Sequence, residues 1–140
     1  MSDPVSVRFA TLADLEFVQQ AHYISSEIIR RKIAWQEIIV AEQQSRLVGY
    51  LRLEFLWSNI PYIALIHIAP ESRRQGIGQA LLGYLEAYLR DKGHLALYSS
   101  SQADEPEPQA WHRRVGFKEY GIIAGINRGG IGEIFFDKQL

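Results

Sequence analysis

The chain has 140 residues, of which 47% are hydrophobic and 22% are charged, and its formal net charge is −1. This composition is typical of a folded globular protein, and the near-neutral charge gives no electrostatic case for binding nucleic acid or an anionic membrane. The chain contains no cysteine, which excludes disulfides, thiolate catalysis and zinc sites built on cysteine.

No targeting or membrane-spanning segment is expected. The apolar stretches are much shorter than the roughly 20 residues that a membrane helix needs. The segment after Met1 lacks the apolar region of a signal peptide, so we expect a cytoplasmic protein. The sequence shows neither a linker nor a repeat, and we expect residues 1–140 to form a single domain.

Hydrophobic periodicity and turn residues divide the chain into strands and helices. Thr11 and Asp14 match a capping box at the start of a helix, and Gly93 and Gly116 stand where helix C-terminal caps are expected. In chain order, the patterns predict strands at 5–9, 37–41, 47–57, 62–68, 95–98, 117–124 and 131–136, and helices at 11–21, 25–33 and 109–114. A further helix is expected to follow the turn at 73–78 and to run to 91–92. Short turns between most strands, with one strand–helix–strand crossover, favour a mixed α/β fold around a largely antiparallel sheet.

Two local expectations concern charged and proline-rich segments. Pro106 and Pro108 are expected to break the acidic loop 104–107, so that the following helix begins only after them. The basic runs 30–32 and 113–114 are expected to be solvated helix faces rather than nucleic-acid contacts.

The segment 66–82 carries most of the functional information. Its Ile-rich start predicts a buried strand that Pro70 ends, because proline cannot donate to a sheet ladder. Arg73, Gly76 and Gly78 then lead into an apolar helical pattern. The first N–H groups of a helix lack intrahelical partners, its dipole favours negative charge, and glycines let phosphates approach the backbone. The segment therefore predicts binding of a phosphorylated ligand.

Two familiar phosphate-binding turns fit this segment poorly. A P-loop requires Lys and then Ser or Thr after the second glycine, where this chain has Gln79. A dinucleotide-binding fingerprint requires a small residue at the position of Leu81 and an acidic residue about 20 positions further on. The chain reads His-Leu-Ala-Leu at 94–97 instead.

The third pattern, Arg-x-x-Gly-x-Gly at 73–78, resembles the acetyl-CoA-binding motif of the GNAT (Gcn5-related N-acetyltransferase) superfamily. The resemblance covers most of the chain, because it includes Ala-Thr-x-x-Asp at 10–14, the apolar strand 66–70, the Leu-Leu pair 81–82 and the helix before Gly-Phe at 110–117. It implies a GNAT-like mixed, largely antiparallel sheet with helices on both faces.

The resemblance also implies where acetyl-CoA binds. Backbone groups of Ile66, His67 and Ile68 would hold the pantetheine arm as an added strand, and residues 74–79 would wrap the pyrophosphate. The implied cofactor-binding set is Ile66, His67, Ile68, Arg73, Arg74, Gln75, Gly76, Ile77, Gly78 and Gln79. His67 projects away from the face of its two neighbours, either toward the acceptor cleft or into the core.

Acetyl transfer to an amine requires a base for the ammonium, donors for the tetrahedral oxyanion and a proton for the departing thiolate. Many relatives carry a tyrosine four residues before the glycine of Gly-Phe, where this chain has His112. An imidazolium can protonate a thiolate, so His112 is the candidate acid, with a surface helix residue as the alternative. Tyr98 and Tyr120 are substitutes for this role if the sheet brings them close.

The base is less well defined by the residues. Glu54 in the long strand is the weak candidate, and Glu27 is a second one. Either side chain could equally face solvent, and a relay through ordered water would leave no trace in the sequence. The four histidines, His22, His67, His94 and His112, show no spacing typical of metal ligands, so no metal is expected.

The sequence therefore predicts an acetyl-CoA-dependent N-acetyltransferase that acts on a primary amine of a small molecule or peptide by direct attack on the thioester. The alternative is a non-catalytic acyl-CoA-binding or regulatory domain, favoured by the missing tyrosine and the undefined base. Segments 23–35 and 57–61 are candidates for the acceptor walls, which the residues do not specify. By resemblance, the C-terminal strands are candidates for a homodimer interface.

Overall fold

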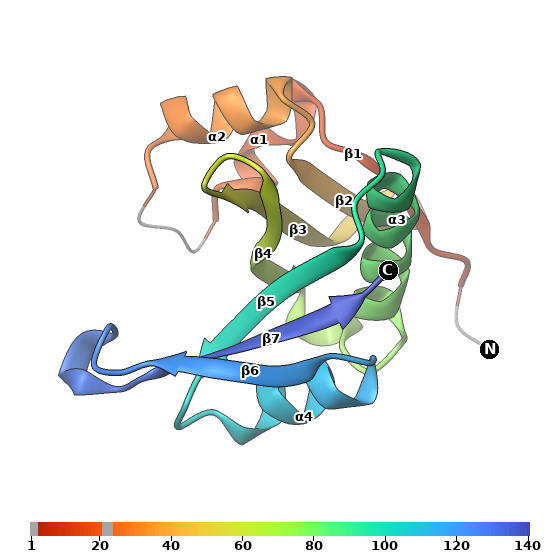
Figure 1. Cartoon of the computed structure of the whole chain (residues 1–140). Helices are drawn as coiled ribbons and strands as arrows, with labels where there is room; N and C mark the ends of the chain where they lie inside the picture. The colour runs from red at the N-terminus through yellow and green to blue at the C-terminus, as the bar shows by residue number, and fades with distance from the viewer. Residues whose placement is uncertain (1–2, 21–23) are drawn as a thin grey trace. The chain divides into compact units, whose positions relative to one another are not determined.

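The computed structural model describes residues 3–20 and 24–140 (Figure 1). Ala21, His22 and Tyr23, which enter the predictions for the first helix, the histidine spacing and the acceptor wall, lie outside the described residues. Residue contacts divide the chain into two compact units, Met1–Leu53 with Leu65–Tyr88, and Glu54–Ala64 with Leu89–Leu140. Strands β3 and β4 and helix α3 run through both units. The single domain stays a prediction.

The first unit is built from the N-terminal strands and helices, and its strands neighbour one another in the order β1-β2-β3-β4. Its elements are β1 (Ser6–Phe9), η1 (Leu12–Asp14), α1 (Leu15–Val18), α2 (Ser26–Ala34), β2 (Ile38–Gln43), most of β3 (Arg46–Leu56), the end of β4 (Ile60–Ile68), η2 (Pro70–Ser72) and most of α3 (Ile77–Asp91). Strand β2 pairs antiparallel with both β1 and β3.

The caps that the sequence predicts lie at the starts of these helices. The Asp14 carboxylate accepts a hydrogen bond from the Thr11 backbone N–H at 2.8 Å. Ser25 caps α2 by accepting from the Ile28 N–H at 3.4 Å. Each cap satisfies an N–H that the first helical turn leaves without a partner.

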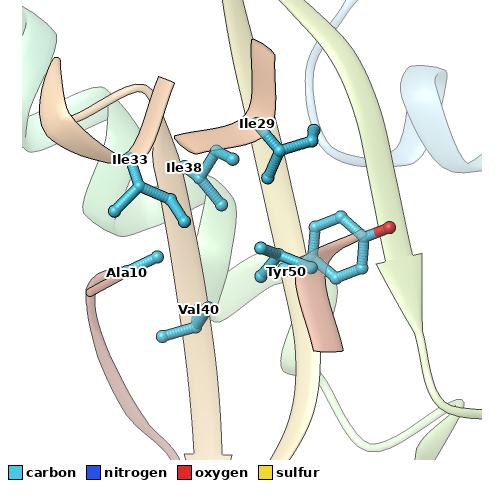
Figure 2. Packing of buried hydrophobic residues seen from close by; sticks show 7 residues of the cluster. Ala10, Ile29, Ile33, Ile38, Val40 and Tyr50 are labelled. Carbon is cyan, nitrogen blue, oxygen red and sulfur yellow. The ribbon is translucent and has the colours of Figure 1, made fainter. Parts of the chain in front are cut away.

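Helices cover both faces of the sheet in the first unit. Ile29 and Ile33 of α2 pack in one buried cluster with Ile38, Val40 and Tyr50, as Figure 2 shows. On the opposite face, the Phe9 ring meets the rings of Tyr84 and Tyr88 of α3 edge to face, at 5.5 and 5.0 Å between centroids. The alternation of side chains along β1 and β2 separates these two layers.

The second unit has the strand order β3-β4-β5-β7-β6 (Figure 1). It contains the end of β3, the start of β4, β5 (Ala96–Gln102), α4 (Pro106–Arg114), β6 (Lys118–Ile123), η3 (Arg128–Gly130) and β7 (Glu133–Gln139). Strand β5 pairs parallel with β4, and β7 pairs antiparallel with β5 and β6. Together with the first unit, these pairings confirm the mixed, largely antiparallel sheet.

Two local predictions were wrong. Helix α4 begins at Pro106 rather than after Pro108. Proline is tolerated there because the first residues of a helix have N–H groups with no intrahelical acceptor. Lys32 is 8% exposed rather than solvated, and its Nζ donates to Glu37 Oε1 and to the Leu53 carbonyl, both at 3.0 Å.

No helix in the described part of the chain combines the length and the apolar character that crossing a bilayer requires.

Candidate functional site

The chain between β4 and α3 reverses through a turn that backbone and side-chain hydrogen bonds hold in place. The Ala69 N–H donates to the Val48 carbonyl of β3 at 2.8 Å, and the Ser72 N–H donates to the Ala69 carbonyl at 2.8 Å. The Arg73 guanidinium folds back, and its Nε donates to the Ile68 carbonyl at 3.2 Å. The end of the strand is therefore fastened to both the neighbouring strand and the turn.

The turn itself adopts conformations that favour glycine. Gly76 has φ +80°, and Arg74 has φ +63°, which is uncommon for a residue with a side chain. The Ala80 N–H donates to the Gly76 carbonyl at 3.0 Å, which begins the hydrogen bonding of α3. The amides of residues 77–79 precede this bond, so they belong to the first helical turn, whose N–H groups have no intrahelical acceptor and can bind an anion.

The start of α3 is anchored by close packing at Gly49 of β3. A Cβ at Gly49 would lie 2.9 Å from Ile68 Cδ1, 3.0 Å from the His67 carbonyl oxygen and 3.3 Å from Ile77 Cγ2. Ile77, the first residue of α3, is 1% exposed. Glycine is therefore the residue that lets β3 approach the end of β4 and the start of the helix at one point.

The structure places the His67 side chain against the core of the first unit. Its ring centroid lies 5.5 Å from that of the buried Tyr50. Burial, with a smaller contribution from the nearby Arg73 cation, lowers the pKa of His67 below its ordinary value. The His67 ring therefore contacts a core side chain while remaining half-buried, and its role at the acceptor stays a prediction.

His112 of α4 lies in the second unit and is 5% exposed, so the alternative of a surface helix residue is wrong. Its Nδ1 lies 2.7 Å from the Pro108 carbonyl, which only accepts, and its Nε2 lies 2.7 Å from Ser99 Oγ. In the neutral ring, Nδ1–H therefore donates to Pro108 and Nε2 accepts from Ser99. The ring also stacks on Phe136, with centroids 4.5 Å apart and planes 2° apart.

This environment disfavours the charged imidazole. Burial lowers the pKa of His112, and this effect outweighs the hydrogen bond to Pro108 and the charge of Glu133, which act in the opposite direction. The phenols named as substitutes lie on the same sheet: the rings of Tyr98 and Tyr120 meet edge to face at 6.5 Å, and Tyr120 is 68% exposed.

The candidate bases differ in their surroundings. Glu27 on α2 is exposed and lies 3.7 Å from Arg31 in an ion pair between its Oε1 and the arginine Nη2. Glu54 is half-buried at the end of β3, in the second unit. Its negative charge contributes to raising the pKa of Tyr62. The first unit thus brings together residues 66–79, while Glu54 and His112 belong to the second.

Sequence reasoning missed a polar chain in the second unit. Tyr62 Oη lies 2.5 Å from Ser100 Oγ, which donates to Glu133 Oε2 at 2.6 Å. A signal existed in the run of serines at 99–101, because alternation along a strand sends Ser100 to the opposite face from Ser99 and Ser101. The two partners of Ser100 lie on β4 and β7, and no local sequence pattern connects those strands with β5.

Within residues 3–20 and 24–140, no group of three or more His, Asp or Glu side chains is arranged to hold a metal ion.

The model of the acetyltransferase (GNAT) family matches residues 9–117, which include the turn, α3 and most of the second unit. The chain belongs to the GNAT family. This match confirms the resemblance that the motif at 73–78 indicates, and it spans both the candidate donor site and the helix that carries His112.

Individual proteins agree with this GNAT assignment. An aminoglycoside N(6')-acetyltransferase type 1 from Stenotrophomonas maltophilia is 36% identical over 53 residues, which are 38% of this chain and 35% of that protein. The matched segment thus spans about a third of the length of this curated relative.

Solved structures show the same fold. The ribosomal-protein-alanine N-acetyltransferase of Brucella melitensis has a TM-score of 0.80 at 23% identity, with 96% of this chain and 99% of that chain covered. A protein from Bacillus anthracis described as a streptothricin acetyltransferase, in complex with acetyl coenzyme A, has a TM-score of 0.68 at 18% identity, with 74% of this chain and 61% of that chain covered.

Replacing Gly49 tests the packing that supports the turn. Gly49→Ala is expected to lower the free energy of unfolding by about 1–3 kcal/mol, because the new methyl group must displace Ile68 or the His67 carbonyl. Chemical denaturation measures this loss. Gly83→Ala is the control, since a Cβ there has open space on α3, and it should stabilise the chain by about 1 kcal/mol. Equal stability of wild type and Gly49→Ala would contradict the close packing.

The buried His112 predicts a stability loss in mild acid. Its pKa is lower in the folded protein than in the unfolded chain, so the unfolded chain takes up the proton first as the pH falls. Stability is therefore full above the unfolded pKa of about 6.5 and is lost as the pH falls toward the folded pKa. His112→Ala should be less stable at pH 7 by about 2–4 kcal/mol and should lack this slope. Denaturation of both proteins from pH 8 to 5 measures the difference.

Proposed function

We propose that this GNAT chain is an acetyl-CoA-dependent N-acetyltransferase. It transfers the acetyl group to a primary amine of a small molecule or peptide, and the amine attacks the thioester directly. The observation that carries the proposal is the turn between β4 and α3, where a fastened strand end, a left-handed Gly76 and the first amides of α3, which begins at the buried Ile77, stand together. Family membership supports acetyl transfer as the chemistry.

The proposed donor site uses the backbone of this segment. The pantetheine arm runs along Ile66, His67 and Ile68, and the pyrophosphate lies against residues 73–79. The positive end of the α3 dipole and its first N–H groups stabilise the phosphate charge. Arg73 contributes by shaping the turn, because its Nε is bonded to the Ile68 carbonyl. A protein of the same fold holds acetyl coenzyme A, which supports this donor.

The amine acceptor is proposed only by chemical class. One relative is named for an aminoglycoside amine and one structural neighbour for a ribosomal-protein alanine. A primary amine is common to both names, so a test panel should contain amino sugars and peptides. We also propose a cytoplasmic location and a homodimer formed through the C-terminal strands.

His112 as acid and Glu54 as base stay predictions. To protonate the CoA thiolate, His112 must first be protonated on Nε2, which burial disfavours and which removes the hydrogen bond from Ser99. Both ring nitrogens of His112 are already hydrogen-bonded within the protein. This favours the second candidate function, a non-catalytic acyl-CoA-binding domain, because such a domain needs no acid. Turnover distinguishes the two functions.

Acetyl-CoA binding and turnover are measured separately. Wild type should show a higher melting temperature with acetyl-CoA and should release thiol with at least one amine of the panel. Gly78→Val should abolish the acetyl-CoA stabilisation while the protein stays folded, because the side chain crowds the pyrophosphate. Gly83→Val, a helix glycine with open space around its Cβ position, is the control. Binding without thiol release on any amine supports the binding domain, and unchanged affinity in Gly78→Val contradicts the placement of the site.

The role of His112 is read from the pH dependence of the reaction. If it is the acid, His112→Ala should slow the chemical step, by roughly 10²-fold or more, with little change in acetyl-CoA affinity, and the alkaline limb of the pH–rate profile should change. An unchanged profile in a folded His112→Ala protein would remove His112 from the mechanism.

A further inference from the structure

Strand β6 forms an open edge of the sheet in the second unit. Among the described strands it stands last in the order, so that β7 is its one neighbour (Figure 1). Every residue from Lys118 to Ile123 is exposed. The backbone N–H and C=O groups on the side away from β7 therefore have no strand partner among the described strands, and such an edge readily pairs with another strand.

Large apolar side chains gather on this edge. Tyr120 is 68% exposed, Ile122 is 59% exposed and Ile123 is 45% exposed. Single exposed apolar side chains are ordinary on a protein surface, whereas a contiguous group of them marks an interaction site. Edge strands that stay uncovered are usually protected by charged side chains or proline. The middle and end of β6 lack that protection, so this edge is suited to an interface.

The apolar side chains lie on both faces of the strand. Ile122 and Ile123 are consecutive residues in regular pairing with β7, so their side chains point to opposite faces of the sheet. A ligand that bound one face would leave the apolar surface of the other face in water. A second strand that continues the sheet contacts both faces and the backbone edge together, and it is the occupant that fits.

The charges on β6 favour a second copy of the same strand in antiparallel direction. Lys118 and Glu119 stand together at the start of the strand, and its end is apolar. In parallel pairing in register, each of these charges would lie beside its own copy, which is destabilising. Antiparallel pairing places both charges beyond the apolar end of the second strand. The ion pair of Glu119 with Arg113, at 3.2 Å, is then undisturbed.

The bulge in β6 indicates the register. The pairing with β7 shifts between Glu119 and Gly121, and it is regular from Gly121 to Ile123. A two-fold axis at Ile122 uses this regular part and keeps each side chain on its own face, whereas a shift by one residue would send it to the other face. Ile122 then meets its copy. Ile123 lies opposite Gly121, where open space surrounds the Cβ position.

The size of this contact predicts a weak dimer. By the usual areas of such groups, the three exposed side chains provide roughly 100 Å² each, or about 600 Å² in the two copies together. The paired strand edges add to this area. Stable interfaces bury about 1,200–2,000 Å², and smaller ones belong to weak complexes. We therefore expect a reversible dimer with a dissociation constant of roughly 1 µM or weaker.

We propose that two copies of this chain form a dimer by antiparallel pairing of their β6 strands, with the two-fold axis at Ile122. The pairing rests on the homodimer proposed above and specifies its strand, direction and register. It does not depend on acetyl-CoA binding or acetyl transfer, because all of its residues belong to the second unit.

A charge exchange at the axis tests the pairing in the full-length protein. Wild type should change from monomer to dimer in sedimentation velocity as its concentration rises. Ile122→Lys and Ile122→Glu should each raise the dissociation constant by roughly 10-fold or more, because like charges then meet at the axis. Both variants should melt as wild type does, since the side chain is exposed.

The rescue and the control belong to the same experiment. An equimolar mixture of Ile122→Lys and Ile122→Glu should dimerise again, because a lysine then faces a glutamate. Leu12→Lys is the control, since Leu12 of the first unit is 59% exposed, as Ile122 is. This variant should dimerise as wild type does.

A cross-link tests the register directly, because the chain contains no cysteine. Opposite Cα atoms in an antiparallel pair lie about 4.5–5.5 Å apart, which is within the range of a disulfide. Ile122→Cys should therefore form a covalent dimer when oxidised glutathione is added, as seen on a non-reducing gel. Gly83→Cys, on α3 with open space around its Cβ position, is the control and should remain a single chain.

The outcomes separate the β6 pairing from the other proposals. A wild type that stays monomeric at every concentration overturns the homodimer and the pairing together, and it leaves the acetyltransferase function, which thiol release measures, unaffected. Dimerisation of Ile122→Lys as strong as that of wild type overturns the pairing alone. So does a mixture of the two charge variants that stays monomeric, or an Ile122→Cys protein that cross-links no faster than Gly83→Cys.

Discussion

The candidate donor site depends on the close approach of β3 to the end of β4 at Gly49. Without a side chain there, Ile68, the His67 carbonyl and Ile77 meet at one point. The strand end and the first residue of α3 are thereby held against a common surface. The backbone amides between them acquire fixed directions, which is what an anion site requires. The hydrogen bonds of Ala69 and Arg73 keep the intervening turn from relaxing.

Strand β5 organises the chemistry of the second unit by alternation alone. Ser99 turns toward α4 and completes a sealed contact with His112, whose two ring nitrogens are both engaged. Ser100 turns the other way and joins Tyr62 to Glu133. Neighbouring residues of identical type thus join different elements. The Ser99–His112 pair is buried, whereas Tyr62, Ser100 and Glu133 are half-buried.

Much of this arrangement is predictable from local pattern, and the rest is not. The Arg-x-x-Gly-x-Gly turn, the capping residues Thr11 and Ser25, and the α3 helix follow from neighbouring residues and are found where the sequence places them. Helix α4 begins earlier than predicted, because proline breaks a helix interior but not its first turn. The sequence predicts that Lys32 is a solvated surface cation, yet it is buried, because its Nζ donates to the Glu37 carboxylate and the Leu53 carbonyl.

The sequence by itself determined the family, the order of strands and helices, and the segment proposed to hold the CoA phosphates. These features depend on residues that are close together in the chain, and the spacing of such residues in the sequence predicts their arrangement in space. Only the tertiary structure decided that His112 is buried and neutral rather than on the surface, and that Tyr62, Ser100 and Glu133 meet. Those contacts join residues 13 to 38 positions apart, and such partners are chosen by strand pairing and packing, which no local pattern encodes.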